Sequence, residues 1–414
     1  MFWITSFIEG AGVAQIYSFM PNRLHEVGVS DGDIGHFVGL LGSLFFVTGL
    51  PFIPLWGVWA DKYSRKAVIV RSALVEAVVF AAVALSQTPW QLVMAMLLVG
   101  FQLGNTGVMM AAIRDVTPTR RFGLAMGLFA ASSPLGFGFG PSLGAFMIDN
   151  LRLASGSVFA TSSLASVAIA VMLTFGSRDV RPSVIPTGST LSLAFGAVRG
   201  VLADPMVRWL FGIYGLVWLG RQMSTQYLTL LVHAVDHTEY NVAGSVGLVV
   251  GLAVIVGAAL SPIGGWLADR IGFRVVMIGS IVGLVVAFVG MALAPTVGWL
   301  FAANVLAVAL QAGVGAMVSG ILATELPPER RSATLNLVFL PLYVGGILGP
   351  ALGSVVYQPG QRSVFWMAAV FVAGGVVLAV MFARRVSARV AATASDPAAG
   401  PAPESDLSAD TGVR

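Results

Sequence analysis

GVWADKYSRK at residues 57–66 returns as GWLADRIGFR at residues 265–274, and each copy lies between two long apolar segments. The aspartates of the two copies are 208 residues apart. A second pair, GFGFGPSLG at residues 136–144 and GGILGPALG at residues 345–353, repeats with its prolines 209 residues apart. Because two unrelated motifs share one period, one half of the chain is a duplicate of the other. In a chain this apolar, such a duplication is typical of secondary transporters, whose site lies between the repeats.

The composition is that of a protein embedded in a lipid bilayer. Hydrophobic residues make up 57% of the 414 residues and charged residues 10%, whereas a soluble domain has about 25% charged residues. Apolar runs long enough to span a bilayer as helices of roughly 20 residues number twelve. They cover approximately residues 2–20, 34–60, 67–87, 89–113, 122–148, 153–176, 207–232, 242–268, 274–294, 296–323, 332–357 and 363–383. The runs are continuously apolar and rarely alternate, which favours an all-α polytopic membrane protein over a barrel.

The basic residues indicate how the chain crosses the membrane. With both termini in the cytoplasm, 19 of the 23 lysines and arginines fall on the cytoplasmic side, and only Arg23, Arg152 and Arg362 fall outside. This bias follows the positive-inside rule, so we expect a multi-pass protein of the cell membrane with both termini cytoplasmic. The basic residues then act as topology signals, and the expected partner is the lipid bilayer, with no nucleic acid. The chain has no cysteine, so disulfides are excluded.

The spans divide the chain into four parts. We expect an N-terminal six-helix bundle at 1–176, a cytoplasmic connector at 177–205, a C-terminal six-helix bundle at 206–385 and a disordered cytoplasmic tail at 386–414. The connector is the longest polar interval before the tail, and the tail has too few large apolar residues to fold. The first span lacks the basic region and cleavage site of a signal peptide, so we expect it to be retained, although the recorded start could be late. We expect a monomer.

The repeated charged stretch resembles a known family signature. Its order is G-x-x-x-D-[RK]-x-x-[RK]-[RK] between the second and third spans, and G-x-x-x-D-R-x-G-x-R between the eighth and ninth. This resembles the signature loop of the major facilitator superfamily, and the twelve spans, the midpoint connector and both repeats match along nearly the whole chain. The resemblance implies twelve transmembrane helices in two pseudo-symmetric six-helix bundles that rock about a central site.

In that family the loop acts as a cytoplasmic latch, in which an aspartate and an arginine pair with neighbouring helix ends. The resemblance therefore implies that Asp61 and Arg65 form a latch, with Asp115 as the partner of Arg65. The second copy has Phe273 in place of a cation, so we predict a weaker latch there. For Lys62 and Lys66, a simple topology anchor is the favoured alternative. The expected latch residues are Gly57, Asp61, Arg65, Lys66, Asp115, Gly265, Asp269, Arg270, Arg274 and Glu325.

The fifth and eleventh spans carry glycines on one helical face, at i, i+4 and i+8, with a proline among them. This spacing lets a neighbouring helix approach closely, and the proline removes one backbone donor. The motif residues are Gly136, Gly140, Pro141 and Gly144, with Gly345, Gly349, Pro350 and Gly353 in the repeat. The spacing in the fifth span also resembles the twelve-helix drug:proton antiporter branch of the superfamily. One departure is that residues 96–102 lack the arginine that this branch usually carries in its fourth helix for proton coupling.

Charges inside predicted spans point to a site. Glu9 lies in the first span and Arg221 in the seventh, and the repeat aligns Glu9 with Val217, one turn before Arg221. A charge inside a span is costly unless it faces protein or water. In this superfamily helices 1, 4, 7 and 10 line the cavity, so we predict that Glu9 and Arg221 face each other or the substrate there. Burial favours the protonated carboxyl and a nearby arginine the ionised one, so Glu9 could exchange protons near neutral pH. A purely structural buried pair is the alternative.

Uncharged amides cluster on the same spans, where they can orient a mostly apolar ligand or simply join helices. The expected cavity residues are Glu9, Gln102, Asn105, Arg221, Gln222, Gln226, Asn304 and Gln311. For Glu76 in the third span, we expect packing against Ser72 or a neighbour rather than a role in transport. His233, Asp236 and His237 have a metal-like spacing but lie in a short polar loop, so we expect no metal site.

We therefore expect a secondary active transporter that moves a small molecule by alternating access, in the form of proton-coupled efflux of amphipathic compounds. Proton-coupled uptake of a nutrient or metabolite is the first alternative, and a membrane receptor or assembly factor that does not transport is the second. The sequence has no nucleotide-binding P-loop and no nucleophile–base constellation, so we expect neither a cofactor nor an enzyme.

Overall fold

The computed structural model describes the whole chain except residues 180–186, 237–241, 326–336, 338–339, 359–361 and 395–414. The described part is helical, without strands. The first half contains α1 (Phe2–Glu26), α2 (Ile34–Val47), α3 (Ile53–Lys62), α4 (Arg65–Leu85), α5 (Pro89–Val99), α6 (Asn105–Val116), α7 (Thr119–Ala145), η1 (Phe146–Asn150) and α8 (Ser155–Gly176). The second half contains α9 (Thr190–Ala203), α10 (Pro205–Val235), α11 (Val242–Val246), η2 (Gly247–Leu252), α12 (Ala253–Ile271), α13 (Phe273–Ala292), α14 (Val297–Glu325), α16 (Leu340–Val356) and α17 (Ser363–Ala394).

These helices match the expected spans. Within the described residues, seven helices are long and apolar enough to cross a membrane, or up to eight if α9 and α10 count as one bent span. The other expected spans correspond to α1, to α2 with α3, to α5 with α6, and to α16. Large apolar side chains remain exposed on the outside, as lipid contact requires: Phe175 is 85% exposed and Leu164 70%. The all-α polytopic fold is confirmed.

Two expected spans are broken. The span predicted at 34–60 stops at Val47 and resumes at Ile53, and the span predicted at 89–113 stops at Val99 and resumes at Asn105. Pro51 cannot donate a backbone hydrogen bond in the first break, and Gly104 adopts a φ of 92° in the second. The breaks lie side by side, because Thr48 Oγ1 donates to the carbonyl of Leu97 at 2.8 Å.

The glycine stripes build the same helix pair in each bundle. α7 packs on α1 so closely that a Cβ on Gly136 would lie 2.0 Å from the carbonyl oxygen of Phe7. In the repeat, α16 packs on α10, and a Cβ on Gly345 would lie 2.8 Å from the amide nitrogen of Leu219. The two bundles are therefore pseudo-symmetric, as the duplication predicts.

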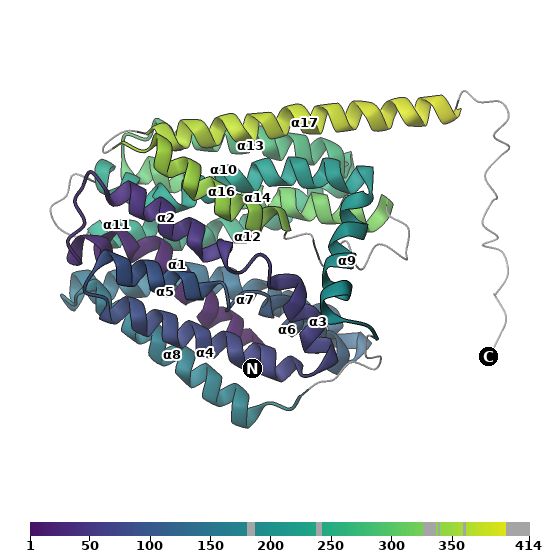
Figure 1. Ribbon diagram of the computed structural model, residues 1–414. Helices are drawn as coiled ribbons and strands as arrows, with labels where there is room; N and C mark the ends of the chain where they lie inside the picture. Colours follow the sequence, from purple (N-terminus) through teal and green to yellow (C-terminus); the bar gives the residue numbers. More distant parts are fainter. Residues whose placement is uncertain (180–186, 237–241, 326–336, 338–339, 359–361, 395–414) are drawn as a thin grey trace.

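The bundles touch each other mainly at one end (Figure 1). Ser43 Oγ donates to the carbonyl of Ile347 at 2.8 Å, and Thr229 Oγ1 donates to the carbonyl of Tyr17 at 3.2 Å. The described hydrogen bonds between the bundles all lie in the parts of the spans far from the 57–66 loop. We call the end with that loop the latch end.

At the latch end the bundle surfaces are less crowded. A Cβ built on Gly107, Gly123, Gly127 or Gly265 would meet no other atom within 4 Å. Gly107 belongs to α6, and Gly123, Gly127 and Gly265 belong to α7 and α12, which meet each other across the two bundles. The bundles are therefore joined away from the latch end and separate toward it.

Two boundaries differ from the sequence expectation. Residues 177–205 contain a helix, α9, whose first turn is capped by Ser189 Oγ, an acceptor for the amide of Ser192 at 3.2 Å. Figure 1 shows α9 beside α3 at the latch end, between the two bundles. At the other boundary, α17 continues to Ala394, past residue 385, because alanine and arginine there are strong helix formers. The remainder of the expected tail lies outside the described residues.

Candidate functional site

A buried polar cluster surrounds Glu9 in the N-terminal bundle. Glu9 is 8% exposed, and its Oε1 accepts a hydrogen bond from Asn105 Nδ2 on α6 and lies 3.4 Å from Ser72 Oγ on α4. Asn105 can reach the carboxyl because it lies in the first turn of α6, directly after the break. The cluster therefore joins α1, α4 and the broken fourth span.

Arg71 belongs to this cluster, although it was expected to be only a topology signal. Its Nη2 donates to the carbonyl of Leu103 at 3.2 Å, while Ser72 Oγ donates to that of Gln102 at 2.8 Å. Neighbouring side chains thus satisfy the carbonyls that the break leaves without helical partners. The guanidinium also stacks on Trp56, 3.7 Å from the ring centroid. The sequence could have indicated this buried position, because Arg71 falls within the predicted span at 67–87.

Glu76 also lies in this region, deeper than Glu9. It is 2% exposed, and its Oε1 is buried without a hydrogen-bond partner. Glu76 packs against a neighbour, as expected. The neighbour is Gly12 of α1, where an added Cβ would lie 3.1 Å from Glu76 Oε1. Its place beside the Glu9 cluster is what the sequence reasoning missed.

Arg221 has its own partner in the C-terminal bundle. Its Nη1 donates to Asn304 Oδ1 on α14 at 3.0 Å, and Asn304 Nδ2 donates to the carbonyl of Val249 in η2 at 2.7 Å. Among the described residues no ion pair joins Glu9 to Arg221, so the expected facing pair is not formed in this structure. The physical reason is that an amide within its own bundle lies closer to each charge.

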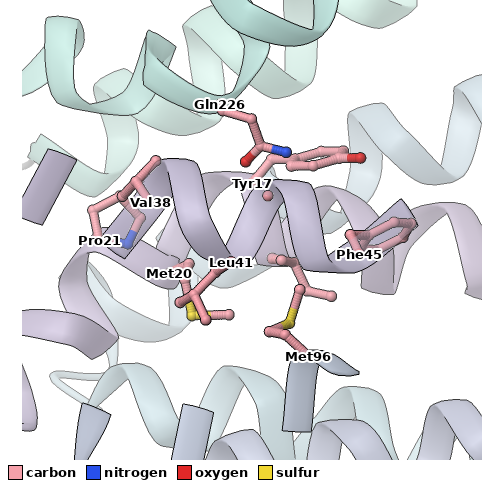
Figure 2. Close-up of a pocket in the computed structure, with 10 residues that line it drawn as sticks. Tyr17, Met20, Pro21, Val38, Leu41, Phe45, Met96 and Gln226 are labelled. Atoms are coloured by element: carbon pink, nitrogen blue, oxygen red, sulfur yellow. The ribbon is translucent and has the colours of Figure 1, made fainter. Parts of the chain in front are cut away.

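A small pocket lies where the two bundles meet. It is a narrow cavity lined by Ile16, Tyr17, Met20, Pro21, Val38, Leu41, Gly42, Phe45, Met96 and Gln226. Figure 2 shows the amide of Gln226 beside the ring of Tyr17, with apolar side chains around them. Gln226 Nε2 is buried without a hydrogen-bond partner. An apolar wall with one available amide suits an amphipathic ligand.

The remaining predicted cavity amides are buried but do not converge on this pocket. Gln102 and Gln222 are 7% and 6% exposed, and the backbone of Gln102 belongs to the break rather than to a helix. Gln311 on α14 is buried with both amide atoms unpaired. A continuous helix would place Gln102 and Asn105 on one face at i and i+3, but the helix is interrupted between Val99 and Asn105.

The first latch is built around Arg65, which is 3% exposed. Its guanidinium lies 3.0 Å from Asp61 Oδ1 and 2.5 Å from Asp115 Oδ2. The hydrogen bond from Arg65, helped by Arg114, holds the pKa of the Asp115 carboxyl below its usual range. Lys66 Nζ donates to the carbonyls that end α8, at 2.7 and 2.8 Å, while Gly57 faces open space. The structure thus places Arg65 between the two expected aspartates.

The second latch is arranged differently. Arg270 stacks on Trp266, 3.9 Å from the ring centroid, and the ring of Phe273 packs against α14, where a Cβ on Gly320 would lie 2.9 Å from it. Between described side chains, no ion pair links Asp269 to Arg270 of this loop. The side chain of Glu325 lies outside the described part of the chain. The cation-to-phenylalanine replacement therefore exchanges a polar contact for an apolar one.

The described residues contain no group of histidine, cysteine or acidic side chains that could hold a metal ion. His233 Nδ1 lies 2.8 Å from the carbonyl of Thr229, one turn earlier on α10. His237, the third member of the metal-like spacing, is outside the described residues.

Comparison with known proteins gives a consistent result. The model of the Major Facilitator Superfamily matches residues 2–244 and 210–409. The multidrug resistance protein MdtG of Proteus mirabilis is 26% identical over 372 residues, covering 89% of this chain and 92% of that protein. The multi-drug resistance efflux pump PmrA of Streptococcus pneumoniae is 25% identical over 377 residues, covering 90% and 92%. The crystal structure of the nucleoside transporter NupG superposes with a TM-score of 0.72 at 17% identity, covering 92% of this chain and 97% of the other.

Proposed function

The chain belongs to the major facilitator superfamily, and we propose that it exports small amphipathic compounds across the cell membrane in exchange for protons. The observation that carries the proposal is the pocket between the bundles, whose apolar wall holds the unpartnered amide of Gln226. A ligand there needs apolar surface and one hydrogen-bond acceptor, which many unrelated amphipathic compounds provide. The names of the relatives MdtG and PmrA support export of drug-like compounds.

Proton exchange is supported by Glu9. Its carboxyl lies within the membrane-spanning part of α1 and is 8% exposed, so proton entry is possible while most of the group is shielded. The polar side chains that contact it are an amide, which donates a hydrogen bond, and a hydroxyl, and neither carries a charge. Such a carboxyl can lose its proton when a conformational change alters its surroundings.

The way the bundles meet supports alternating access as the transport mechanism. We take the latch end as cytoplasmic, as the basic residues predict, and both termini with it. The hydrogen bonds between bundles, such as Ser43 to Ile347, then close the outer side while the inner side is free to take up substrate. Rocking of 1–176 against 206–385 would reverse this arrangement, and residues 177–205 would act as the connector.

The test uses purified protein in liposomes with ethidium as the transported probe. With the liposome interior acidified, protein inserted with its latch end outward should accumulate ethidium, because protons leave as the probe enters. A one-unit pH gradient can drive at most about tenfold accumulation per proton. The Glu9→Gln variant should lose this accumulation. Unchanged transport and pH dependence in Glu9→Gln would remove the proton role of Glu9, and movement of the probe with the protons would favour uptake over export.

A further inference from the structure

We propose that Glu76 and Glu9 form one proton-binding site, in which a single proton is shared between two buried carboxyls beside Arg71. The proposal deepens the proposed function and rests on it for its role in transport. Binding of the proton itself is separate, because it can be measured without any substrate.

The two carboxyls lie at the same interface between α1 and α4. Ser72, one turn before Glu76 on α4, has its Oγ 3.4 Å from Glu9 Oε1. Gly12, about one turn after Glu9 on α1, lies against Glu76, where a Cβ would approach Oε1 to 3.1 Å. The two contacts are one helical turn apart on both helices, so the acidic side chains enter one shared space. Gly12 leaves room for two side chains of α4, the ring of Phe80, which a Cβ would approach to 2.6 Å, and the carboxyl of Glu76.

No cation other than Arg71 faces the pair among the described residues. The described sequences of α5 and α8 contain no charged residue, and the charged residues of α6 (Arg114 and Asp115) and of α7 (Arg120 and Arg121) lie at the latch end. Glu76 Oε1 accepts no hydrogen bond although it is fully enclosed, and the polar side chains beside the carboxyl, Gln102 and Ser166, carry no charge. An ionised carboxylate in such a place is expensive, so Glu76 needs either a proton or a cation.

The charges balance with one proton. Two carboxylates and one guanidinium carry a net charge of −1, and one bound proton makes the cluster neutral. A neutral cluster is the stable form inside an apolar bundle, and titration belongs to the pair rather than to either carboxyl alone. When the proton leaves, the new carboxylate can attract Arg71, whose Nε and Nη1 are buried without partners. Because Arg71 also holds the carbonyl of Leu103, proton release would act on the break in the fourth span.

Infrared difference spectra of the purified protein between acidic and alkaline pH test the proposal directly. The protonated carboxyl has its own C=O stretching band, so the spectrum should contain a band from the pair that disappears with rising pH. Glu76→Gln should remove or shift this band, and so should Glu9→Gln. Glu76→Asp, which keeps a carboxyl, should retain a shifted band and shows whether the site still folds. If the spectrum of Glu76→Gln equals that of the wild type, the shared site does not exist.

Transport provides the second readout. At a one-unit pH gradient, Glu76→Gln should lower ethidium accumulation by up to about tenfold, the whole contribution of one coupled proton. Glu26→Gln is the matched control, because its carboxyl pairs with Arg23 at 2.7 Å outside the cluster, and it should accumulate ethidium like the wild type. If the wild type moves no probe, the proposed function fails while the infrared result stands. If Glu76→Gln accumulates like the wild type, Glu76 has no part in coupling.

Discussion

α1 and α10 occupy equivalent places in the two bundles, and each packs along a glycine stripe on its partner, α7 or α16. Their chemistry differs. Where α1 has Glu9, the repeat has Val217, and where α4 has Glu76, it has Leu284 in α13, which is fully buried. Arg71 corresponds to Gly279. Duplication has therefore kept the backbone contacts that define the fold, while the acidic cluster is confined to the first half.

The broken spans, like the acidic cluster, lie in the first half of the chain. The second and fourth spans are interrupted, whereas their counterparts run as unbroken helical segments from Val242 to Ile271 and from Val297 to Glu325. A break exposes carbonyls inside the membrane region, which need donors. Arg71 and Ser72 supply them. The break and the buried cation thus support each other, and we infer that the N-terminal bundle is the half that changes shape when protons bind.

The largest effect should come from filling the glycine stripes. A Cβ on Gly140 would lie 2.2 Å from the carbonyl oxygen of Ala11, whereas one on Gly349 would lie 2.8 Å from that of Leu219. Both neighbours are backbone, so helices must move apart. We expect Gly140→Ala to destabilise the protein by about 3 kcal/mol and Gly349→Ala by about 1 to 2 kcal/mol. Thermal unfolding in detergent measures both, and equal losses would show that the stripes pack alike.

The second-largest effect should be the difference in stability and transport between variants of the two latches. Arg65→Gln removes a buried guanidinium from two aspartates, which we expect to cost about 2 kcal/mol of stability. Arg274→Gln alters a loop in which Phe273 already supplies an apolar contact, so its effect should be smaller. Ethidium transport should fall more in Arg65→Gln than in Arg274→Gln. The reverse ranking in transport would contradict the asymmetry between the latches.

A smaller effect is expected at the break. Ser72→Ala removes the donor to the carbonyl of Gln102, at a cost of about 1 kcal/mol. The repeat counterpart, Ser280 in the unbroken half, provides the control as Ser280→Ala. Hydrogen exchange should become faster at the amides of residues 100–104 only in Ser72→Ala. Equal exchange in both variants would mean that Ser72 does not hold the break.

Much of the architecture could be predicted because it depends on patterns that can be read within short stretches of the sequence. Apolar runs locate the spans, and the repeat locates the helix pairs, since glycines at every fourth position need a close neighbour. The positions of Asp61, Arg65 and Asp115 follow from the signature loop. These features depend on residues close together in sequence or on a motif whose context is fixed.

The cluster around Glu9 could not be predicted, for identifiable reasons. The break at 100–104 lies in an apolar run with glycines, which membrane helices commonly contain, and the φ of Gly104 is fixed only by packing. Without the break, Gln102 and Asn105 would share a helical face. The positive-inside rule places Arg71 at the membrane surface, although its side chain reaches the carbonyls of the break. Glu76 packs against α1 as expected, but no pattern within α4 places it beside Glu9, because that contact depends on a neighbouring helix.

The smallest expected effect concerns the pH dependence of the first latch. Arg65 lowers the pKa of Asp115, so the folded protein holds this carboxylate ionised to lower pH than the unfolded chain does. The pair therefore contributes its full stability above the unfolded pKa of about 4, and this contribution is lost as pH falls through the lower folded value. Thermal unfolding between about pH 5 and pH 3 should show a smaller loss of stability in Asp115→Asn than in the wild type. Asp269→Asn, in the loop without a described ion pair, should follow the wild-type curve, and a flattened curve there would mean that the second latch is also ionic.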